Sequence, residues 1–148
     1  MGFTWTKETR PRWDADKQAA FDAVALASVG MKAPTSDAAA IADEWWRVAD
    51  EVGNLIGYGW LDSEWGDAQI AFFVTPRARG NGAGEFILNR LEAEAAARGL
   101  NYIYNVIPAG HPDPQWMTYW LTQHGFYPSP HGDLRRQVHA AGEHDPHA

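Results

Sequence analysis

The sequence contains no cysteine. This absence excludes disulfide bonds, a cysteine thiolate as nucleophile and zinc sites built on cysteine ligands. A chain without cysteine is compatible with any redox environment, so the cellular compartment stays open on this ground.

Positively charged residues are also scarce. Lysine and arginine number 12 against 19 aspartates and glutamates, which gives a formal net charge of −7 and a pI near 5.2. Non-specific binding to DNA or RNA depends on neutralising phosphates, so this balance argues against a nucleic-acid partner. A cationic small molecule or a basic peptide suits the charge better.

Long apolar runs are missing as well. No stretch approaches the roughly 20 apolar residues that span a bilayer, and the N-terminus lacks the apolar run of a signal peptide. We therefore expect a soluble, cytoplasmic protein without a membrane partner.

The remaining composition suits one folded domain. The chain has 148 residues, of which 45% are hydrophobic, and this is enough for a core of useful size. We expect a domain over residues 1–138 and a disordered tail over residues 139–148. The tail histidines, His139, His144 and His147, are interpreted as solvated, so no metal site is expected.

Periodicity, capping residues and turn signals predict an α+β fold around one mixed sheet. Three of the strands form an antiparallel meander, in which Gly57 and Gly59 indicate a close backbone approach or a bulge. The expected strands cover residues 3–8, 45–49, 55–61, 68–74, 101–107, 126–127 and 134–138. The expected helices cover residues 14–28, 36–43, 82–98 and 114–124, and the last has an apolar face of Trp116, Met117, Trp120 and Leu121.

The segment over residues 72–88 carries the clearest chemical signal. A buried strand ends there, and a loop with Gly80, Gly82 and Gly84 leads directly into an amphipathic helix. A helix start offers free N–H groups and the positive end of a dipole, and glycine lets an anion approach the backbone closely. Arg77 and Arg79 add positive charge.

Acidic residues are absent from this region. At the average density of 19 acidic residues in 148, the 17 residues from 68 to 84 would carry about two, yet they carry none. Together these features predict a cradle for a phosphate or pyrophosphate, with a plain glycine-rich loop as the alternative. A Walker loop is excluded because Glu85 follows Gly84, and a dinucleotide fingerprint is excluded because no acidic residue ends the next strand.

The same residues resemble the coenzyme A motif of the GNAT (Gcn5-related) N-acetyltransferase superfamily. That motif reads Arg/Gln-x-x-Gly-x-Gly/Ala, and residues 79–84 match every fixed position. The family's Val-x-Pro strand end corresponds to residues 74–76, its paired aliphatic residues to 87–88 and its Gly-Phe motif to 125–126. The order of elements over roughly residues 3–138 also resembles this family.

The resemblance implies a splayed sheet flanked by about four helices, with acetyl-CoA as cosubstrate. The pyrophosphate would be bound by Arg79, with Arg77 nearby, and by the backbone of Gly80, Asn81, Gly82, Ala83 and Gly84. The backbone of Phe73 and Val74, on a strand splayed by a bulge, would pair with pantetheine. An amine would then attack the acetyl group directly, without a covalent enzyme intermediate.

The acid and the base of this reaction are not fixed by the sequence. An amine with a pKa near 10.4 must lose a proton, at a cost of roughly 4.6 kcal/mol at neutral pH, and the thiolate leaving group benefits from an acid. The family often has a tyrosine four residues before the Gly-Phe glycine, but Leu121 stands there. Tyr119 is the first candidate acid, with a packed aromatic as its alternative; Tyr127, His124 or water are others. Candidate bases are Glu64, Asp67, Gln69 (through a water), His111 and Asp113.

Eight tryptophans are many for this length. Trp45, Trp46, Trp60 and Trp65 lie on or beside the strands that border the acceptor groove in this family. They would either form an aromatic wall for a cation or belong to the core.

These observations predict an N-acetyltransferase that moves the acetyl group of acetyl-CoA to a primary amine of a small molecule or peptide. Two alternatives stay open: a transferase for a longer acyl-CoA, and a catalytically silent module that binds acyl-CoA. The oligomeric state is open, with a homodimer as one alternative.

Overall fold

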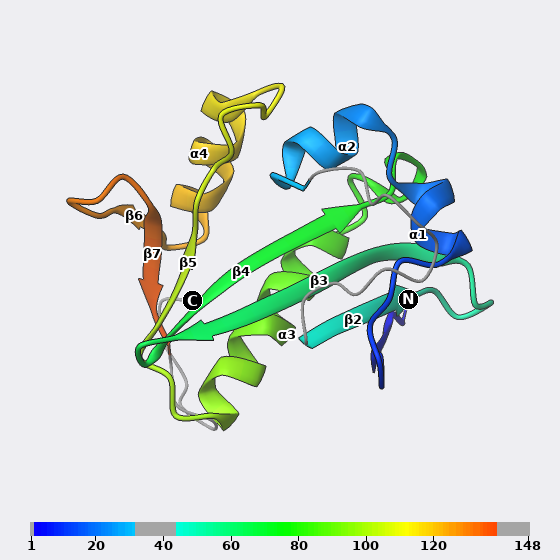
Figure 1. The fold of residues 1–148 in the computed structure, drawn as a ribbon, viewed down its shortest axis with the longest axis horizontal. Coiled ribbons are helices and arrows are strands. Elements are labelled where there is room, and N and C mark those ends of the chain that lie inside the picture. The colour runs from blue at the N-terminus through cyan, green and yellow to red at the C-terminus, as the bar shows by residue number, and fades with distance from the viewer. Residues whose placement is uncertain (1, 32–43, 139–148) are drawn as a thin grey trace.

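The computed structural model describes residues 2–31 and 44–138, which form one open sheet with helices on both faces (Figure 1). In this part of the chain the strand order is β1-β2-β3-β4-β5-β7-β6. The strands are β1 Thr4–Lys7, β2 Glu44–Ala49, β3 Leu55–Glu64, β4 Asp67–Val74, β5 Tyr102–Asn105, β6 Tyr127–Pro128 and β7 Leu134–Gln137. The helices are α1 Ala15–Ala20, α2 Ala23–Ser28, the 3₁₀ turn η1 Pro76–Ala78, α3 Ala83–Ala97 and α4 Pro114–Gln123.

Among the described strands, β4 and β5 are the one parallel pair, and the others pair antiparallel. The connection from β4 to β5 contains α3, because a parallel return needs a crossover. This confirms the expected α+β fold, the antiparallel meander of β2, β3 and β4, and the long helix.

Two hydrophobic clusters lie on opposite faces of the sheet. One joins α3 and α4 to the sheet, with Ile87, Leu91, Ile103 and Leu121 all 0% exposed. The other lies under α1 and α2 and is mostly aromatic; Phe21 is its centre, with its ring centroid 4.5 Å from that of Phe73. The sheet is therefore a platform held rigidly from both sides.

The glycines in β3 confirm a close approach. A Cβ on Gly59 would lie 2.8 Å from Ile87 Cγ2, so this glycine lets α3 pack directly on the strand. A Cβ on Gly57 would lie 2.2 Å from the carbonyl oxygen of Phe73 on β4. Both positions exclude any side chain.

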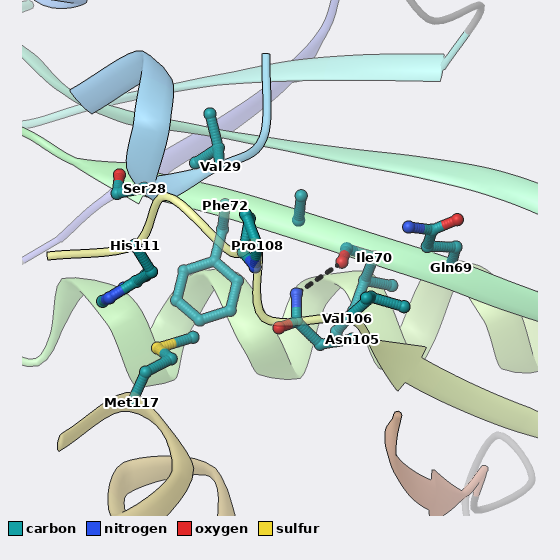
Figure 2. A pocket seen from close by; sticks show the side chains of 11 residues that line it. Ser28, Val29, Gln69, Ile70, Phe72, Asn105, Val106, Pro108, His111 and Met117 are labelled. Carbon is teal, nitrogen blue, oxygen red and sulfur yellow. Dashed lines mark hydrogen bonds between the residues drawn. The ribbon is translucent and has the colours of Figure 1, made fainter. Parts of the chain in front are cut away.

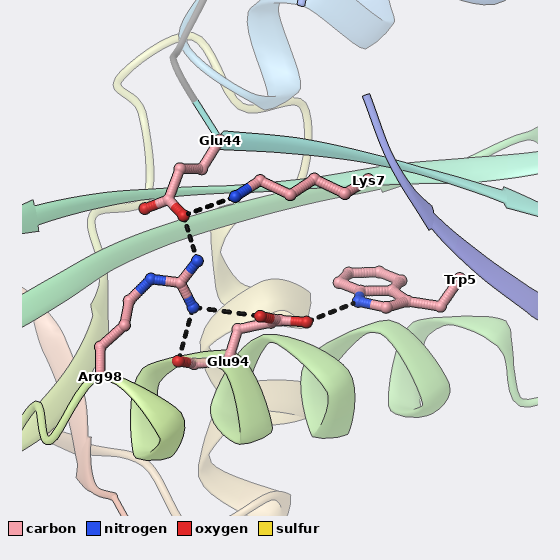
Figure 3. A network of polar contacts seen from close by, with 5 residues as sticks. All are labelled: Trp5, Lys7, Glu44, Glu94 and Arg98. Atoms are coloured by element: carbon pink, nitrogen blue, oxygen red, sulfur yellow. Dashed lines mark hydrogen bonds and ion pairs between the residues drawn. The ribbon is translucent and has the colours of Figure 1, made fainter. Parts of the chain in front are cut away.

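A polar network connects the C-terminal end of α3 to β1 and β2 (Figure 3). Arg98 is hydrogen-bonded to both Glu94 and Glu44, and Glu44 also pairs with Lys7 at 3.3 Å. Trp5 Nε1 donates to Glu94 Oε2 at 3.3 Å. Burial alone would lower the pKa of Arg98. The hydrogen bonds and negative charges of Glu94 and Glu44 outweigh this effect and raise the pKa, so the guanidinium stays charged.

The helix expected over residues 14–28 is wrong as a single element. Asp14 caps α1 as expected, but Phe21 adopts an extended conformation and Asp22 caps a second helix, accepting from Ala25 N at 2.8 Å. The physical reason is burial: the extended backbone carries the Phe21 ring into the aromatic cluster. The short helix expected over residues 36–43 lies outside the described residues.

Two further expectations need correction. The strand expected over residues 101–107 ends at Asn105, because the chain leaves the sheet there. Trp116, expected on the apolar face of α4, is 55% exposed. The disordered tail expected over residues 139–148 lies outside the described residues.

Candidate active site

The sheet opens between β4 and β5. Their parallel pairing is limited, among the described residues, to Ala68 with Ile103 and Gln69 with Tyr104. Beyond these pairs the two strands diverge toward α2 and α4, as Figure 1 shows. The splay that the family resemblance implied is therefore present, and beyond Gln69 it leaves one edge of β4 without a neighbouring strand in the described part of the chain.

The expected bulge is not the cause of this splay. Along its described length β4 stays in continuous register with β3, from Val74 opposite Gly57 to Asp67 opposite Glu64. The register shift lies instead in β2, between Val48 and Ala49. It is β5 that turns away from a regular β4.

A side chain bridges the gap where the ladder stops. Asn105 Nδ2 donates to the carbonyl oxygen of Ile70 at 2.9 Å, one residue beyond the last strand pair, and Asn105 is only 8% exposed. This buried amide replaces a backbone hydrogen bond and fixes the opening angle at its apex. Asn105 was not among the site residues predicted from the sequence; the available signal was a polar residue on the core-facing side of β5, two positions after Ile103.

The glycine-rich loop joins β4 to α3 at the open end of the splay. Gly80 and Gly82 have φ of +85° and +80°, a conformation that favours glycine, and Gly82 is the N-cap of α3. A Cβ at either residue would meet no described atom within 4 Å, so the space beside the loop is open. The first N–H groups of α3 thus start beside open space, as an anion cradle requires.

The third glycine has a different role. A Cβ on Gly84 would lie 3.3 Å from Trp120 Cζ2, so this position lets α4 pack closely against the start of α3. Trp120 also contacts Phe72 of β4, with ring centroids 5.6 Å apart. The loop, β4 and α4 therefore enclose one common space.

That space is a groove of about 720 Å³, a size suited to a large cofactor. Most of the residues predicted to bind the coenzyme line it: Phe73, Val74, Arg79, Gly80, Gly82, Ala83 and Gly84. Arg79 Nε also donates to the Val74 carbonyl oxygen at 3.4 Å. Arg77 and Asn81 lie in the same loop and are exposed, outside the described residues that line the groove.

A second, small cavity of about 40 Å³ lies at the apex of the splay (Figure 2). It shares Ser28, Phe72, His111 and Met117 with the groove, so the two spaces meet at these side chains. Gln69, a candidate for orienting water, lines the small cavity. Its described walls contain no carboxylate, lysine or arginine.

In their neutral forms, His111 and His124 in the groove carry the proton on different ring nitrogens. His111 Nδ1 accepts from Asp113 N at 2.9 Å, so its proton is on Nε2. His124 Nδ1 lies 2.8 Å from the Trp120 carbonyl oxygen, which can only accept, so its Nε2 carries a lone pair. One ring offers a donor and the other an acceptor.

The other candidate acids and bases lie elsewhere. Tyr119 is 62% exposed and is not among the described residues that line either cavity. Glu64 and Asp67 lie opposite each other in the strand register, at the hairpin that joins β3 to β4. Asp113 lines the groove but caps α4, accepting from Trp116 N at 3.1 Å. Leu121 is 0% exposed.

The tryptophans divide between core and surface. Trp45, Trp46 and Trp60 are between 1% and 7% exposed, and Trp45 stacks on Trp60 at 4.1 Å. Trp65 is 95% exposed at the tip of the β3–β4 hairpin. The core alternative is confirmed for the first three, because a wall for a cation needs open ring faces.

Negative charge gathers around Tyr104, where β4 and β5 are still paired. Partial burial raises the pKa of Tyr104, and the carboxylates of Glu64, Asp133, Asp67 and Asp62 raise it further. Tyr104 pairs with Gln69 across β4 and β5, so this field reaches the wall of the small cavity.

Within the described residues, no cluster of three metal-ligating side chains is present and none of the helices is long and apolar enough to cross a membrane. A comparison with curated proteins gives no match.

Solved structures share the fold. A phosphinothricin acetyltransferase of the GNAT superfamily from Sinorhizobium meliloti, in complex with acetyl-CoA, is 21% identical, with a TM-score of 0.54 over 70% of this chain and 66% of that one. A spermidine N-acetyltransferase from Vibrio cholerae, in complex with CoA and spermine, is 18% identical, with a TM-score of 0.54 over 64% and 65%. The match thus spans about two thirds of the length of these structures. Their bound acetyl-CoA and CoA agree with the expected cosubstrate.

The sequence itself matches the profile described as "Acetyltransferase (GNAT) family" over residues 6–113. This range contains the meander, the glycine-rich loop, α3 and β5, and it is more than half of the chain. The protein therefore belongs to the GNAT acetyltransferase family.

Proposed function

We propose that this protein is an N-acetyltransferase that moves the acetyl group of acetyl-CoA directly to a primary amine of a small molecule or peptide. One observation carries the proposal: the open edge of β4 and the glycine-rich start of α3 face the same groove of about 720 Å³. A long anionic ligand with a thioester at its far end suits that arrangement.

The coenzyme would be held at two places. Arg79 and the backbone of residues 80–84 would bind the pyrophosphate, and Arg77 and Asn81 belong to the same proposed set through their place in the loop. The backbone of Phe73 and Val74 would pair with the pantetheine amides, since among the described strands β5 pairs with β4 only at Ala68 and Gln69 and leaves this end of the edge open.

His111 and His124 would have different roles in the acetyl transfer. Nε2–H of His111 would donate to the thioester oxygen, where negative charge develops as the amine attacks. It would not give up its proton, because that would leave an imidazolate. Nε2 of His124 would accept the proton that the amine loses, and the departing thiolate would take a proton from water.

Tyr119 remains a prediction as the acid, although its exposed position outside the groove gives it no support. If its hydroxyl protonates the thiolate, Tyr119→Phe should lower turnover by roughly 100-fold or more. We expect wild-type turnover instead, measured as thiol release. A large loss with unchanged affinity for acetyl-CoA would return Tyr119 to the site.

The acceptor is proposed to be cationic. The chain has a net charge of −7, and carboxylates surround Tyr104 beside the small cavity. The spermidine acetyltransferase that shares this fold also supports an amine acceptor. A panel of polyamines, monoamines and amino acids, assayed by thiol release, would identify the class.

Binding and turnover together test the proposal. We expect excess acetyl-CoA to raise the melting temperature and at least one amine to release CoA. Binding without release over the whole panel would favour the silent module, for which the buried Leu121 is the specific support. Absence of any thermal shift would contradict both.

A further inference from the structure

The small cavity has the position of an acyl pocket. It lies beyond the groove, and Ser28, Phe72, His111 and Met117 belong to the walls of both spaces. In Figure 2 the Asn105–Ile70 hydrogen bond closes one end, while His111 and Met117 stand at the other. A thioester that entered from the groove would place its acyl carbon atoms here.

The size of this cavity is restrictive. Its volume is about 40 Å³, and because a cavity needs roughly 10–15 Å³ to hold one water molecule, it has room for only about three groups of that size. An acetyl group has one methyl beyond its carbonyl, and each further methylene needs additional space of this order. The attacking amine must also reach the carbonyl carbon, so a longer chain would compete with it for the same volume.

Most of the side chains that line the small cavity are held in place by their neighbours. Ile70 is 1% exposed in the core, and Asn105 is fixed by its buried hydrogen bond. Pro108 is a rigid ring pressed close to the backbone at Gly30, where a Cβ would lie 3.1 Å from Pro108 Cγ. Phe72 is fixed by contact with Trp120.

Met117 differs from these walls. It is half-buried on α4, it lines both spaces, and its side chain is unbranched. Its length therefore sets the room left at the entrance to the cavity.

We infer that the cavity restricts the transferred group to a short acyl chain, with Met117 as the residue that sets the limit. The inference rests on the proposed transferase function and makes it more specific. It excludes the longer acyl-CoA alternative for the natural sequence.

The test is a series of acetyl-, propionyl-, butanoyl- and hexanoyl-CoA, assayed with one amine. An extra methylene in a hydrophobic pocket changes kcat/KM by roughly 10-fold or more, so wild type should lose at least that much between acetyl- and butanoyl-CoA. Met117→Ala should raise the butanoyl-to-acetyl ratio of kcat/KM by about 10-fold. Met117→Leu, which conserves volume, should keep the wild-type ratio.

Gln115→Ala is the matched control, since Gln115 is exposed on the same helix and outside both described cavity walls. If Met117→Ala melts far below wild type, Phe72→Leu enlarges the cavity from another wall and should shift the ratio in the same direction. Equal kcat/KM for all four thioesters in wild type, or an unchanged ratio in a folded Met117→Ala, would overturn the inference.

Binding measured by calorimetry shows whether the transferase proposal or only the chain-length limit fails. If no acyl-CoA binds, the proposed function itself fails. If all four bind and react equally well, only the chain-length limit fails and the transferase assignment stands.

Discussion

Gly80 and Gly82 show, at the scale of single residues, how backbone conformation leaves open space beside a helix start. Each has a positive φ, and each faces space free of described atoms. A side chain would both strain the turn, by roughly 1–2 kcal/mol for a left-handed residue, and fill the space where an anion is proposed to bind.

Gly82→Glu tests the cradle. We expect it to abolish acetyl-CoA binding in calorimetry, because a carboxylate would stand where the pyrophosphate is proposed to lie. Gly99→Glu is the matched control: Gly99 has φ +69° and open surroundings, but lies at the other end of α3. Unchanged affinity in Gly82→Glu would refute the site, and equal losses in both variants would point to helix destabilisation instead.

His111→Ala tests the proposed oxyanion donor. Removing one such donor costs roughly 100-fold or more in kcat, and we expect that loss with the calorimetric affinity for acetyl-CoA retained. His111→Gln, whose side-chain amide can donate, should recover part of the rate. His131→Ala, in the exposed turn between β6 and β7, serves as the control. A kcat for His111→Ala equal to that of wild type would remove His111 from the mechanism.

At the scale of elements, the decisive feature is where β5 leaves β4. The parallel ladder ends after Gln69 and Tyr104, and Asn105 bridges the gap to Ile70. The open edge, the groove and the small cavity all follow from this divergence. Without the bridge, the Ile70 carbonyl would be a buried acceptor without its partner.

Asn105→Asp removes that donor with almost no change in shape. An unsatisfied buried polar group costs about 1–3 kcal/mol, and we expect the free energy of unfolding in urea to fall by at least that amount at neutral pH. Asn89→Asp, exposed on α3, makes the same chemical change without loss of such a bond. If the two variants had the same free energy of unfolding, the Asn105–Ile70 hydrogen bond would not contribute to stability.

At the scale of the whole molecule, charge and architecture act together. The sheet is packed from both faces, so the splay is held by two clusters rather than by the loops around it. The net charge of −7 surrounds this scaffold with a field that attracts cations.

Salt dependence tests this field. Screening shortens from about 30 Å at 0.01 M to about 8 Å at 0.15 M ionic strength, so the KM for a polyamine acceptor should rise over this range. The KM for a monoamine should rise much less, and that for acetyl-CoA serves as the control for general salt effects. A polyamine KM that stayed constant would exclude long-range attraction as the source of preference.

The features determined by the sequence alone are those that depend on neighbouring residues. Asp113 before Pro114 predicts the start of α4, the glycines at 80, 82 and 84 predict the loop before α3, and alternation predicts the meander. Local signals were insufficient at Phe21, where burial against residues far along the chain overrides the helical pattern and divides the helix.

The tertiary structure alone decided the shape of the site. Asn105 and Ile70 are 35 residues apart, and their contact exists only because a parallel crossover brings the two strands together. The volume around Met117 depends in the same way on side chains from α2, β4, β5 and α4. Hydrogen bonds and caps within a few residues can be predicted from the sequence, whereas a cavity is the space left by packing elements that are distant in the chain, and that space has no local signal.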